Sequence, residues 1–212
     1  MKAMRLPTHM RPRLLASIVV LAATSACGDV IRQGKSPVLV VVDSLKGAPG
    51  GGFGANTFTD TLRSDVIVNV TSPLPCKPEA PCPTIYDDSG QVVMHVVAKD
   101  LAIEPTSNNQ VTITRYHVAY RRADGRNTPG VDVPFGFDGG VTGTIPPAGT
   151  LMLVFELVRH VAKEEAPLAQ LRTSPNIINT IADVTFYGTD LVGNAVTATA
   201  SMSIEFGNFG DQ

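Results

Sequence analysis

Three histidines, His95, His117 and His160, are the candidates for acid–base chemistry in this chain. Histidine changes its charge near neutral pH, so it can take up or release a proton under physiological conditions. His95 and His117 fall on the polar side of alternating stretches, which is typical of surface histidines. His160 follows Glu156 by four residues and shares a predicted strand face with it. This pair is therefore the candidate site for one alternative function, a hydrolase.

No motif in the sequence adds a nucleophile or a metal to these histidines. G-x-S-x-G, S-x-x-K and H-E-x-x-H, which mark serine nucleophiles and zinc-dependent proteases, are all absent. The chain is therefore expected to have no catalytic residues, no cofactor and no metal site, and not to be an enzyme.

Cys76 and Cys82 enclose five residues in the proline-dense segment PLPCKPEAPCP. In an exported protein such a pair predicts a disulfide. The spacing differs from C-x-x-C, and no histidine lies nearby in the sequence to complete a zinc site. A redox or metal role is the weaker alternative.

Two further segments resemble ligand sites only superficially. Residues 47–54, GAPGGGFG, lack the Lys-Ser/Thr of a phosphate-binding loop and precede no predicted helix, so we interpret them as a flexible linker. Asp87 and Asp88, followed by Ser-Gly, predict a hairpin turn. The alternative for this pair, and for Asp183 with Asp190, is a calcium site, although no alternating run of oxygen ligands is present.

Four phenylalanines lie among glycines outside the main alternating stretches: Phe135, Phe137, Phe206 and Phe209. Exposed together, they would form an apolar patch that contacts a protein partner or a glycan. The alternative is that they close one end of the core.

The elements that must position these residues are strands. Apolar side chains recur at every second position through most of the chain, which is the period of a half-buried strand. The residues predicted to face the core are Val38, Val40, Val42, Val66, Val68, Val70, Val92, Met94, Val96, Ala98, Tyr116, Val118, Tyr120, Leu151, Leu153, Phe155, Leu157, Ala182, Val184, Phe186, Val196, Ala198, Ala200, Met202, Ile204 and Phe206. Residues 163–171 are the only helical candidate, and Pro167 in their middle favours a loop with one short turn.

These stretches amount to about seven or eight strands in residues 37–212, each with one apolar face. Two such sheets cover each other economically, so we expect an all-β fold, an antiparallel two-sheet sandwich forming one domain. The chain of 212 residues is 43% hydrophobic and has no basic cluster, which argues against a disordered chain and against nucleic-acid binding.

The N-terminus carries a targeting signal. Four basic residues and no acidic one precede the uncharged run LLASIVVLAA, which is too short to span a bilayer. Thr-Ser-Ala before Cys27 resembles the lipobox of bacterial lipoproteins, although Thr24 replaces the usual Leu. The resemblance implies a signal peptide at residues 1–26, an acylated Cys27 and a tether at residues 27–36. It places the protein in the bacterial cell envelope, attached to the membrane by lipid, with the outer membrane favoured because Asp29 does not directly follow Cys27.

A second resemblance concerns the end of the chain. Residues 184–204, with Asp190, Gly193 and Asn194 at the turn, resemble the closing hairpin of bacterial immunoglobulin-like and fibronectin-III-like domains. The resemblance implies a sandwich that is immunoglobulin-like in the broad sense. The sequence departs from antibody domains because it has no Trp and no widely spaced cysteine pair.

Together these features predict a non-catalytic lipoprotein that displays an immunoglobulin-like sandwich as a structural or binding module. After Cys27 the chain has thirteen basic and nineteen acidic residues, a net charge of −6, so attachment to the membrane must come from lipid. An envelope protein or a glycan is the expected partner. An accessory subunit of a larger envelope assembly, pairing through its last strand, is the alternative within binding proteins.

Overall fold

The computed structural model describes residues 34–100, 102 and 104–210. The predicted signal peptide and Cys27 lie outside the described residues. Within the described part of the chain, no helix is long and apolar enough to cross a membrane.

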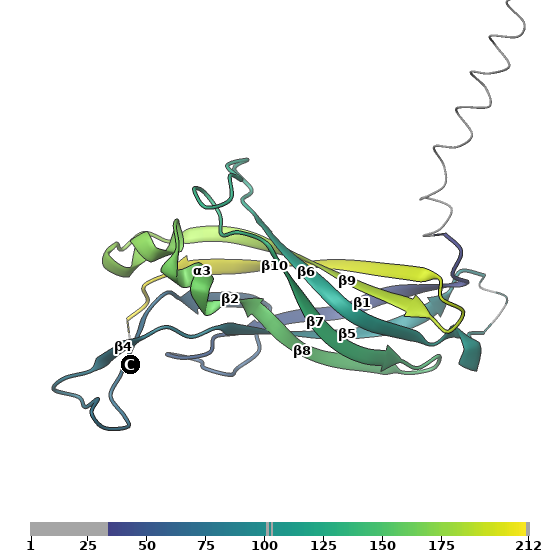
Figure 1. The fold of residues 1–212 in the computed structure, drawn as a ribbon, viewed down its shortest axis with the longest axis horizontal. Helices are drawn as coiled ribbons and strands as arrows, with labels where there is room; N and C mark the ends of the chain where they lie inside the picture. Colours follow the sequence, from purple (N-terminus) through teal and green to yellow (C-terminus); the bar gives the residue numbers. More distant parts are fainter. Residues whose placement is uncertain (1–33, 101, 103, 211–212) are drawn as a thin grey trace, which may run out of the picture.

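The described part of the molecule is built mainly from strands that run along its long axis (Figure 1). The strands are β1 (Val38–Ala48), β2 (Thr61–Asp65), β3 (Val68–Val70), β4 (Cys82–Thr84), β5 (Asp88–Ala98), β6 (Val111–Arg121), β7 (Phe137–Ile145), β8 (Thr150–Val158), β9 (Ile178–Asp190) and β10 (Ala195–Gly207). The helical elements of the described residues are two 3-10 turns, η2 (Ser107–Asn109) and η3 (Leu168–Thr173), and one short α-helix, α3 (His160–Glu164). The predicted all-β class is confirmed.

Two larger sheets and one small sheet contain these strands. The three-stranded sheet has the order β1-β5-β8, and the five-stranded sheet has the order β2-β10-β9-β6-β7. Neighbouring strands are antiparallel except that β2 runs parallel to β10. The third sheet consists of β3 and β4 alone.

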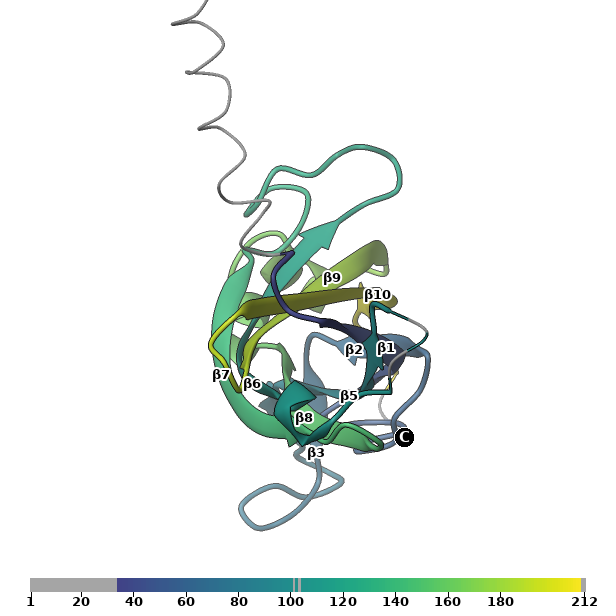
Figure 2. The same ribbon diagram turned by 90° about the vertical axis from the view of Figure 1, so that its right-hand side faces the viewer.

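The five-stranded sheet curls around the core (Figure 2). At one margin its last strand, β7, lies beside β8 of the three-stranded sheet. At the other margin, Gly47 at the end of β1 exchanges two backbone hydrogen bonds of 2.9 Å with Thr59, just before β2. The two large sheets therefore approach each other at both margins and enclose one core.

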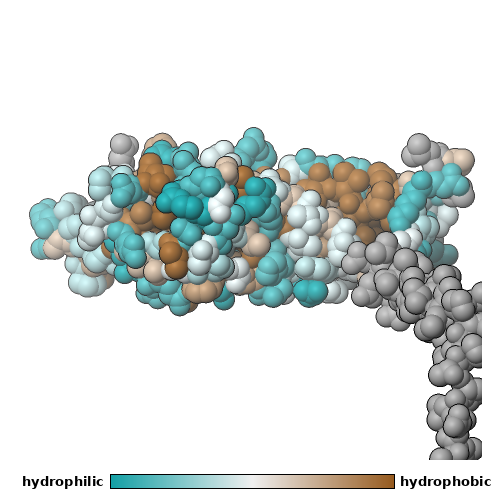
Figure 3. Space-filling view, turned by 90° about the horizontal axis from the view of Figure 1, so that it is seen from above, coloured by the Kyte–Doolittle hydropathy of each residue, from teal (hydrophilic) through white to brown (hydrophobic). Residues whose placement is uncertain are grey.

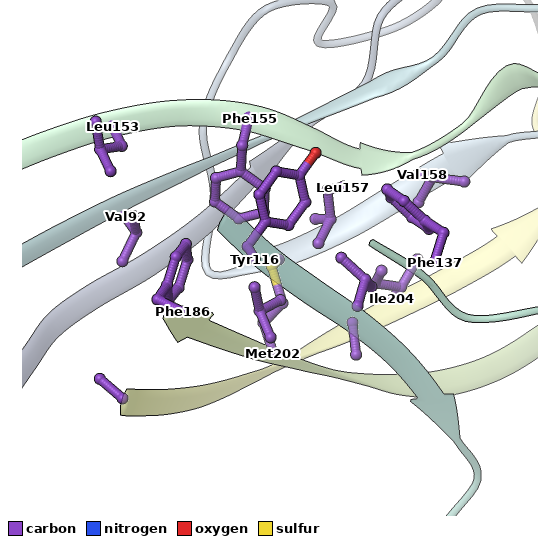
Figure 4. Packing of buried hydrophobic residues seen from close by; sticks show 14 of the residues in the cluster. Val92, Tyr116, Phe137, Leu153, Phe155, Leu157, Val158, Phe186, Met202 and Ile204 are labelled. Atoms are coloured by element: carbon purple, nitrogen blue, oxygen red, sulfur yellow. The ribbon is translucent and has the colours of Figure 1, made fainter. Parts of the chain in front are cut away.

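The predicted alternation is confirmed at the centre of this core. Tyr116 on β6 packs against Phe155 on β8, with ring centroids 4.8 Å apart, and Phe155 packs edge-on against Phe186 on β9 at 5.3 Å (Figure 4). All three rings are almost fully buried. Aromatic rings from both large sheets thus meet in one cluster, which joins the sheets by burial of apolar area.

Three expectations about local structure are wrong. Residues 66–71 do not form one strand, because pairing with β4 begins only at Val68, and the preceding strand β2 was missed. Asp88 and Gly90 form no hairpin turn, since they begin the long strand β5. Residues 163–171 contain the end of α3 and most of η3 rather than a single turn, joined around a cis Ala166–Pro167 peptide bond.

Apolar side chains are also present on the surface, where they gather in patches between polar areas (Figure 3). Leu39 and Val41 on β1, and Met152 and Val154 on β8, are between one third and two thirds exposed. These residues occupy the positions that alternate with core residues on their strands, so the three-stranded sheet is apolar on both faces.

Candidate binding groove and its buried support

An ion pair between Asp88 and Lys163 is completely buried near the end of the molecule that carries α3. Lys163 Nζ lies 2.8 Å from Asp88 Oδ2 and donates to Oδ1 at 2.9 Å. Each side chain is 1% exposed. A charge removed from water in this way requires a partner and further hydrogen bonds.

Two more groups donate to the Asp88 carboxylate. The Ser64 hydroxyl donates to Oδ2 at 2.5 Å, and the Gly50 backbone N–H donates to Oδ1 at 3.1 Å. Burial raises the pKa of the Asp88 carboxyl above its ordinary value of 3.8, while the Lys163 ammonium and these donors oppose the rise. Asp88 on β5 therefore holds three separate segments: α3, β2 and the loop after β1.

Two adjoining hollows lie beside the segments that Asp88 holds. The first, of about 420 Å³, is lined by Gly51, Phe53, Arg63, Asp65, Phe209 and Gly210. The second, of about 510 Å³, is lined by Pro49, Phe53, Gly54, Thr57, Thr59, Thr61 and Arg63. Because Phe53 and Arg63 line both, we treat the hollows as one site, which we call the Phe53–Arg63 groove. Each volume lies in the range of small-ligand sites.

The groove combines exposed aromatic surface with a positive charge. Phe53 is 74% exposed. The Arg63 guanidinium lies over the ring of Phe209, 4.4 Å from its centroid, which is a favourable cation–π geometry. Asp65 holds the backbone next to this ring, because its Oδ1 accepts the backbone N–H groups of Ile67 at 3.3 Å and Phe209 at 3.4 Å.

The buried ion pair supports the groove directly. Gly50, which donates to Asp88, adjoins the lining residue Gly51, and Ser64 lies between Arg63 and Asp65 in the sequence. One carboxylate thus positions the loop on one side of the groove and the strand on the other. The arrangement suits binding of a ligand between two fixed walls.

The four phenylalanines predicted as ligand contacts do not form one patch. Phe137 and Phe206 are 7% and 0% exposed and belong to the core, which agrees with the alternative that these residues close the core and with the core face predicted for Phe206. Phe135 is 51% exposed but lies before β7 and lines neither hollow. Phe209 is half-buried and lines the groove, which makes it the one member of the set at the candidate site.

The histidines occupy separate surfaces. His95 Nδ1 lies 2.8 Å from Asp43 Oδ1, and His117 Nδ1 lies 3.2 Å from Asp138 Oδ1, in partly exposed pairs. Glu156 and His160 do not share a strand, because β8 ends at Val158 and His160 begins α3. Among the residues that the structure describes, these two form no ion pair within 4 Å.

The acidic residues considered for calcium have other partners. Asp183 binds Arg121 at 2.6 Å and accepts the Ser201 hydroxyl at 2.5 Å. Asp190 accepts the backbone N–H groups of Val192 at 3.1 Å and Asn194 at 2.8 Å, which closes the β9–β10 turn. In the described residues, no three histidine, cysteine or acidic side chains gather as metal ligands would.

The predicted disulfide between Cys76 and Cys82 is present, with an S–S distance of 2.11 Å and Cα atoms 5.3 Å apart. Inside this loop Lys77 and Ala80 exchange backbone hydrogen bonds. The loop lies beside β4, which projects at the left-hand end of Figure 1.

Sequence reasoning missed the principal residues of the site: Phe53, Arg63 and Lys163. A partial signal was available for Phe53, which is a large apolar residue in the glycine-rich stretch interpreted as a linker. None was available for the pair of Lys163 and Asp88, because 75 positions separate them and only the packing of α3 against β5 brings them together.

Comparison with known proteins gives no family for this chain. No protein-family model matches it, and no curated protein is significantly similar to it. It is similar to a solved structure titled "X-ray structure of Northeast Structural Genomics Consortium target SoR45", with 11% sequence identity and a TM-score of 0.35. The match covers 79% of this chain and 86% of the other.

Proposed function

We propose that the protein is a non-catalytic cell-envelope lipoprotein, attached through an acylated Cys27, whose β-sandwich displays the Phe53–Arg63 groove as a binding site. The sandwich is immunoglobulin-like in the broad sense. Two features favour this interpretation: the common core of two mainly antiparallel sheets, and the hairpin at Asp190–Asn194. The parallel contact between β2 and β10 is its departure from a simple antiparallel sandwich.

The observation that carries the binding role is the exposure of Phe53. A phenylalanine that is 74% exposed gains little from burial in the isolated protein, yet it lines both hollows of the groove. Exposed aromatic side chains of this kind are enriched at recognition surfaces. A partner that covers the ring would recover the free energy of removing its surface from water.

The short tether also fits display close to a membrane. Strand β1 begins at Val38, eleven residues after Cys27. An extended chain spans at most about 3.6 Å per residue, so this segment reaches about 40 Å. The groove lies beyond the other end of β1, beside Pro49, so it would face away from the anchored end of the molecule.

The lipid anchor is tested by expressing the full chain with Cys27→Ser in a bacterial host. We expect the unsubstituted protein to incorporate radioactive palmitate and to sediment with membranes, and the variant to lose both properties. Palmitate incorporation by the Cys27→Ser variant would contradict the assignment.

The binding role is tested by photo-crosslinking in native membranes. A photoreactive amino acid at position 57, on the groove, is expected to give a discrete crosslinked product that Phe53→Ser abolishes. Phe135→Ser is the matched control, because Phe135 is also an exposed loop phenylalanine but lies outside the groove. A product that is insensitive to Phe53→Ser, or no product, would count against the groove.

The alternative function, an accessory subunit of a larger assembly, requires that one edge of the last strand, β10, is free to pair with a strand of another protein. On β10 the register with β2 covers Ser203–Gly207, so that part of the strand has neighbours on both sides. Only residues 195–202 pair with β9 alone among the described strands. This alternative, like the hydrolase, stays a prediction without a specific observation in its favour.

A further inference from the structure

We propose that the Phe53–Arg63 groove binds a peptide carboxylate that adjoins an apolar side chain. The carboxylate pairs with the Arg63 guanidinium and the apolar side chain lies against Phe53. This inference rests on the binding role proposed above and names the chemistry of the ligand.

The Arg63 side chain is the cation that this proposal pairs with the ligand carboxylate. Among the described residues it forms no ion pair within 4 Å, although most other arginines near carboxylates do, such as Arg121 with Asp183 and Arg122 with Asp124. Glu205 lies directly across from Arg63 in the β2–β10 register, yet their charged atoms are farther apart than 4 Å. The planar guanidinium remains available to form two parallel hydrogen bonds to a carboxylate.

The guanidinium is also held in one place. Its position over the Phe209 ring, whose backbone N–H is bound by Asp65, limits the conformations of a side chain that is otherwise long and mobile. A guanidinium that is already oriented loses less conformational entropy on binding than a free one does.

The second hollow matches the apolar part of such a ligand. The lining of this hollow contains no acidic residue, whereas Asp65 lines the first hollow, so a ligand carboxylate fits the second hollow better than the first. The rings of Pro49 and Phe53 provide apolar contact, and the Thr57 and Thr61 hydroxyls, which bind no other described residue, are donors beside Arg63. Its volume of about 510 Å³ accommodates a side chain together with the adjoining backbone.

The lining favours a peptide over a glycan. Recognition of sugar hydroxyls requires several acceptors, whereas the second hollow contains no Asn, Gln, Asp or Glu. The Thr59 hydroxyl is already engaged with the carbonyl of Thr61 at 2.7 Å. A carboxylate, an apolar side chain and few hydroxyls are the properties of a peptide terminus.

The test measures fluorescence anisotropy with the detergent-solubilised full-length protein. The probe is a pool of fluorescein-labelled Gly-Gly-X-X peptides, in which X is Ala, Val, Leu or Phe, with either a free C-terminal carboxylate or a C-terminal amide. We expect the free acid to bind at least tenfold more tightly than the amide. Arg63→Gln should reduce the affinity for the acid to that for the amide and leave binding of the amide unchanged.

Three variants separate the ligand chemistry from the binding role. Arg63→Lys keeps the charge but loses the planar fork, so an intermediate affinity for the acid is expected. Phe53→Ser should weaken the acid and the amide alike. Arg126→Gln, which removes another exposed arginine, is the matched control and should change neither affinity.

Equal affinity of the wild-type protein for acid and amide would overturn the carboxylate assignment, as would binding of the acid that Arg63→Gln leaves unchanged. Tighter binding of a fluorescein-labelled glucuronic-acid trisaccharide than of the peptide pool would overturn the assignment to a peptide. Absence of binding to every probe would overturn the whole inference. The binding role itself fails if the crosslink in native membranes is absent or is insensitive to Phe53→Ser.

Discussion

Two aspartates, Asp88 and Asp124, each bind basic side chains, but in opposite surroundings. Asp88 and Lys163 are each 1% exposed and come from elements 75 positions apart. Asp124 binds Arg122 at 2.7 Å and Arg126 at 2.9 Å, and its side chain is 42% exposed. The first pair connects β5 to α3, whereas the second group connects residues of a single loop.

The electrostatic consequences are opposite as well. Burial raises the pKa of the Asp88 carboxyl, because the charged form has lost its hydration. Hydrogen bonds from Arg122 and Arg126 hold the pKa of the Asp124 carboxyl well below its ordinary value. Forming the buried pair therefore costs desolvation free energy, and removing one of its members destabilises the fold. When a member of the exposed group is removed, water hydrates the charges that remain.

The largest effect is expected for Lys163→Met. Methionine fills much of the same volume but leaves the Asp88 carboxylate buried without its cation. Removing one partner of a buried ion pair costs about 3 to 5 kcal/mol, so the free energy of unfolding should fall by that amount. Urea denaturation followed by circular dichroism measures the loss. A decrease below about 1 kcal/mol would mean that the pair is not buried in solution.

The double substitution Asp88→Leu with Lys163→Met sharpens the comparison. It removes both charges, so the desolvation cost disappears together with the attraction, and stability should recover most of what the single variant lost. The Ser64 hydroxyl and the Gly50 N–H then lose their acceptor, which prevents full recovery. A double variant no more stable than Lys163→Met would show that those hydrogen bonds, rather than the ion pair, dominate.

The same contrast explains what the sequence could reveal. The core positions followed from the alternation of Val92, Met94 and Val96, and of similar runs, because a strand with one buried face imposes a period of two. Lys163 could not be recognised, since a lysine in a polar stretch is ordinarily exposed. Its burial depends on an acceptor from a distant strand. The groove was missed for the same reason: its walls are brought together by tertiary contacts around Asp88.

Asp190 is an intermediate case, since it is only 4% exposed but binds neutral donors, most of them within its own turn. Asp190→Ala should lower the free energy of unfolding by about 1 to 2 kcal/mol, because the N–H groups of Val192 and Asn194 lose their acceptor. Thermal denaturation near pH 7 measures this loss. An unchanged melting temperature would contradict the assigned role of the turn.

The contribution of Asp190 also has a predictable dependence on pH. Burial raises the pKa of its carboxyl, but hydrogen bonds from Asn194, Ser36 and Val192 outweigh burial, so the net pKa lies below 3.8. A lowered folded-state pKa means that the contribution is complete above 3.8 and is lost as the pH falls through the folded value. The stability difference between the wild type and Asp190→Ala should therefore be constant from pH 5 to 7 and shrink below pH 3.8.

The smallest effect is expected for Asp124→Asn, which removes the charge from the exposed group. Water replaces the interactions lost by Arg122 and Arg126, and all three residues belong to one loop that joins no distant elements. The melting temperature should stay within experimental error of the wild type at physiological salt, and raising the salt concentration should not separate the two proteins. A clear destabilisation would show that the stability of the sheets depends on this loop. The number of basic side chains that an aspartate binds would then predict its contribution to the free energy of unfolding better than its burial does.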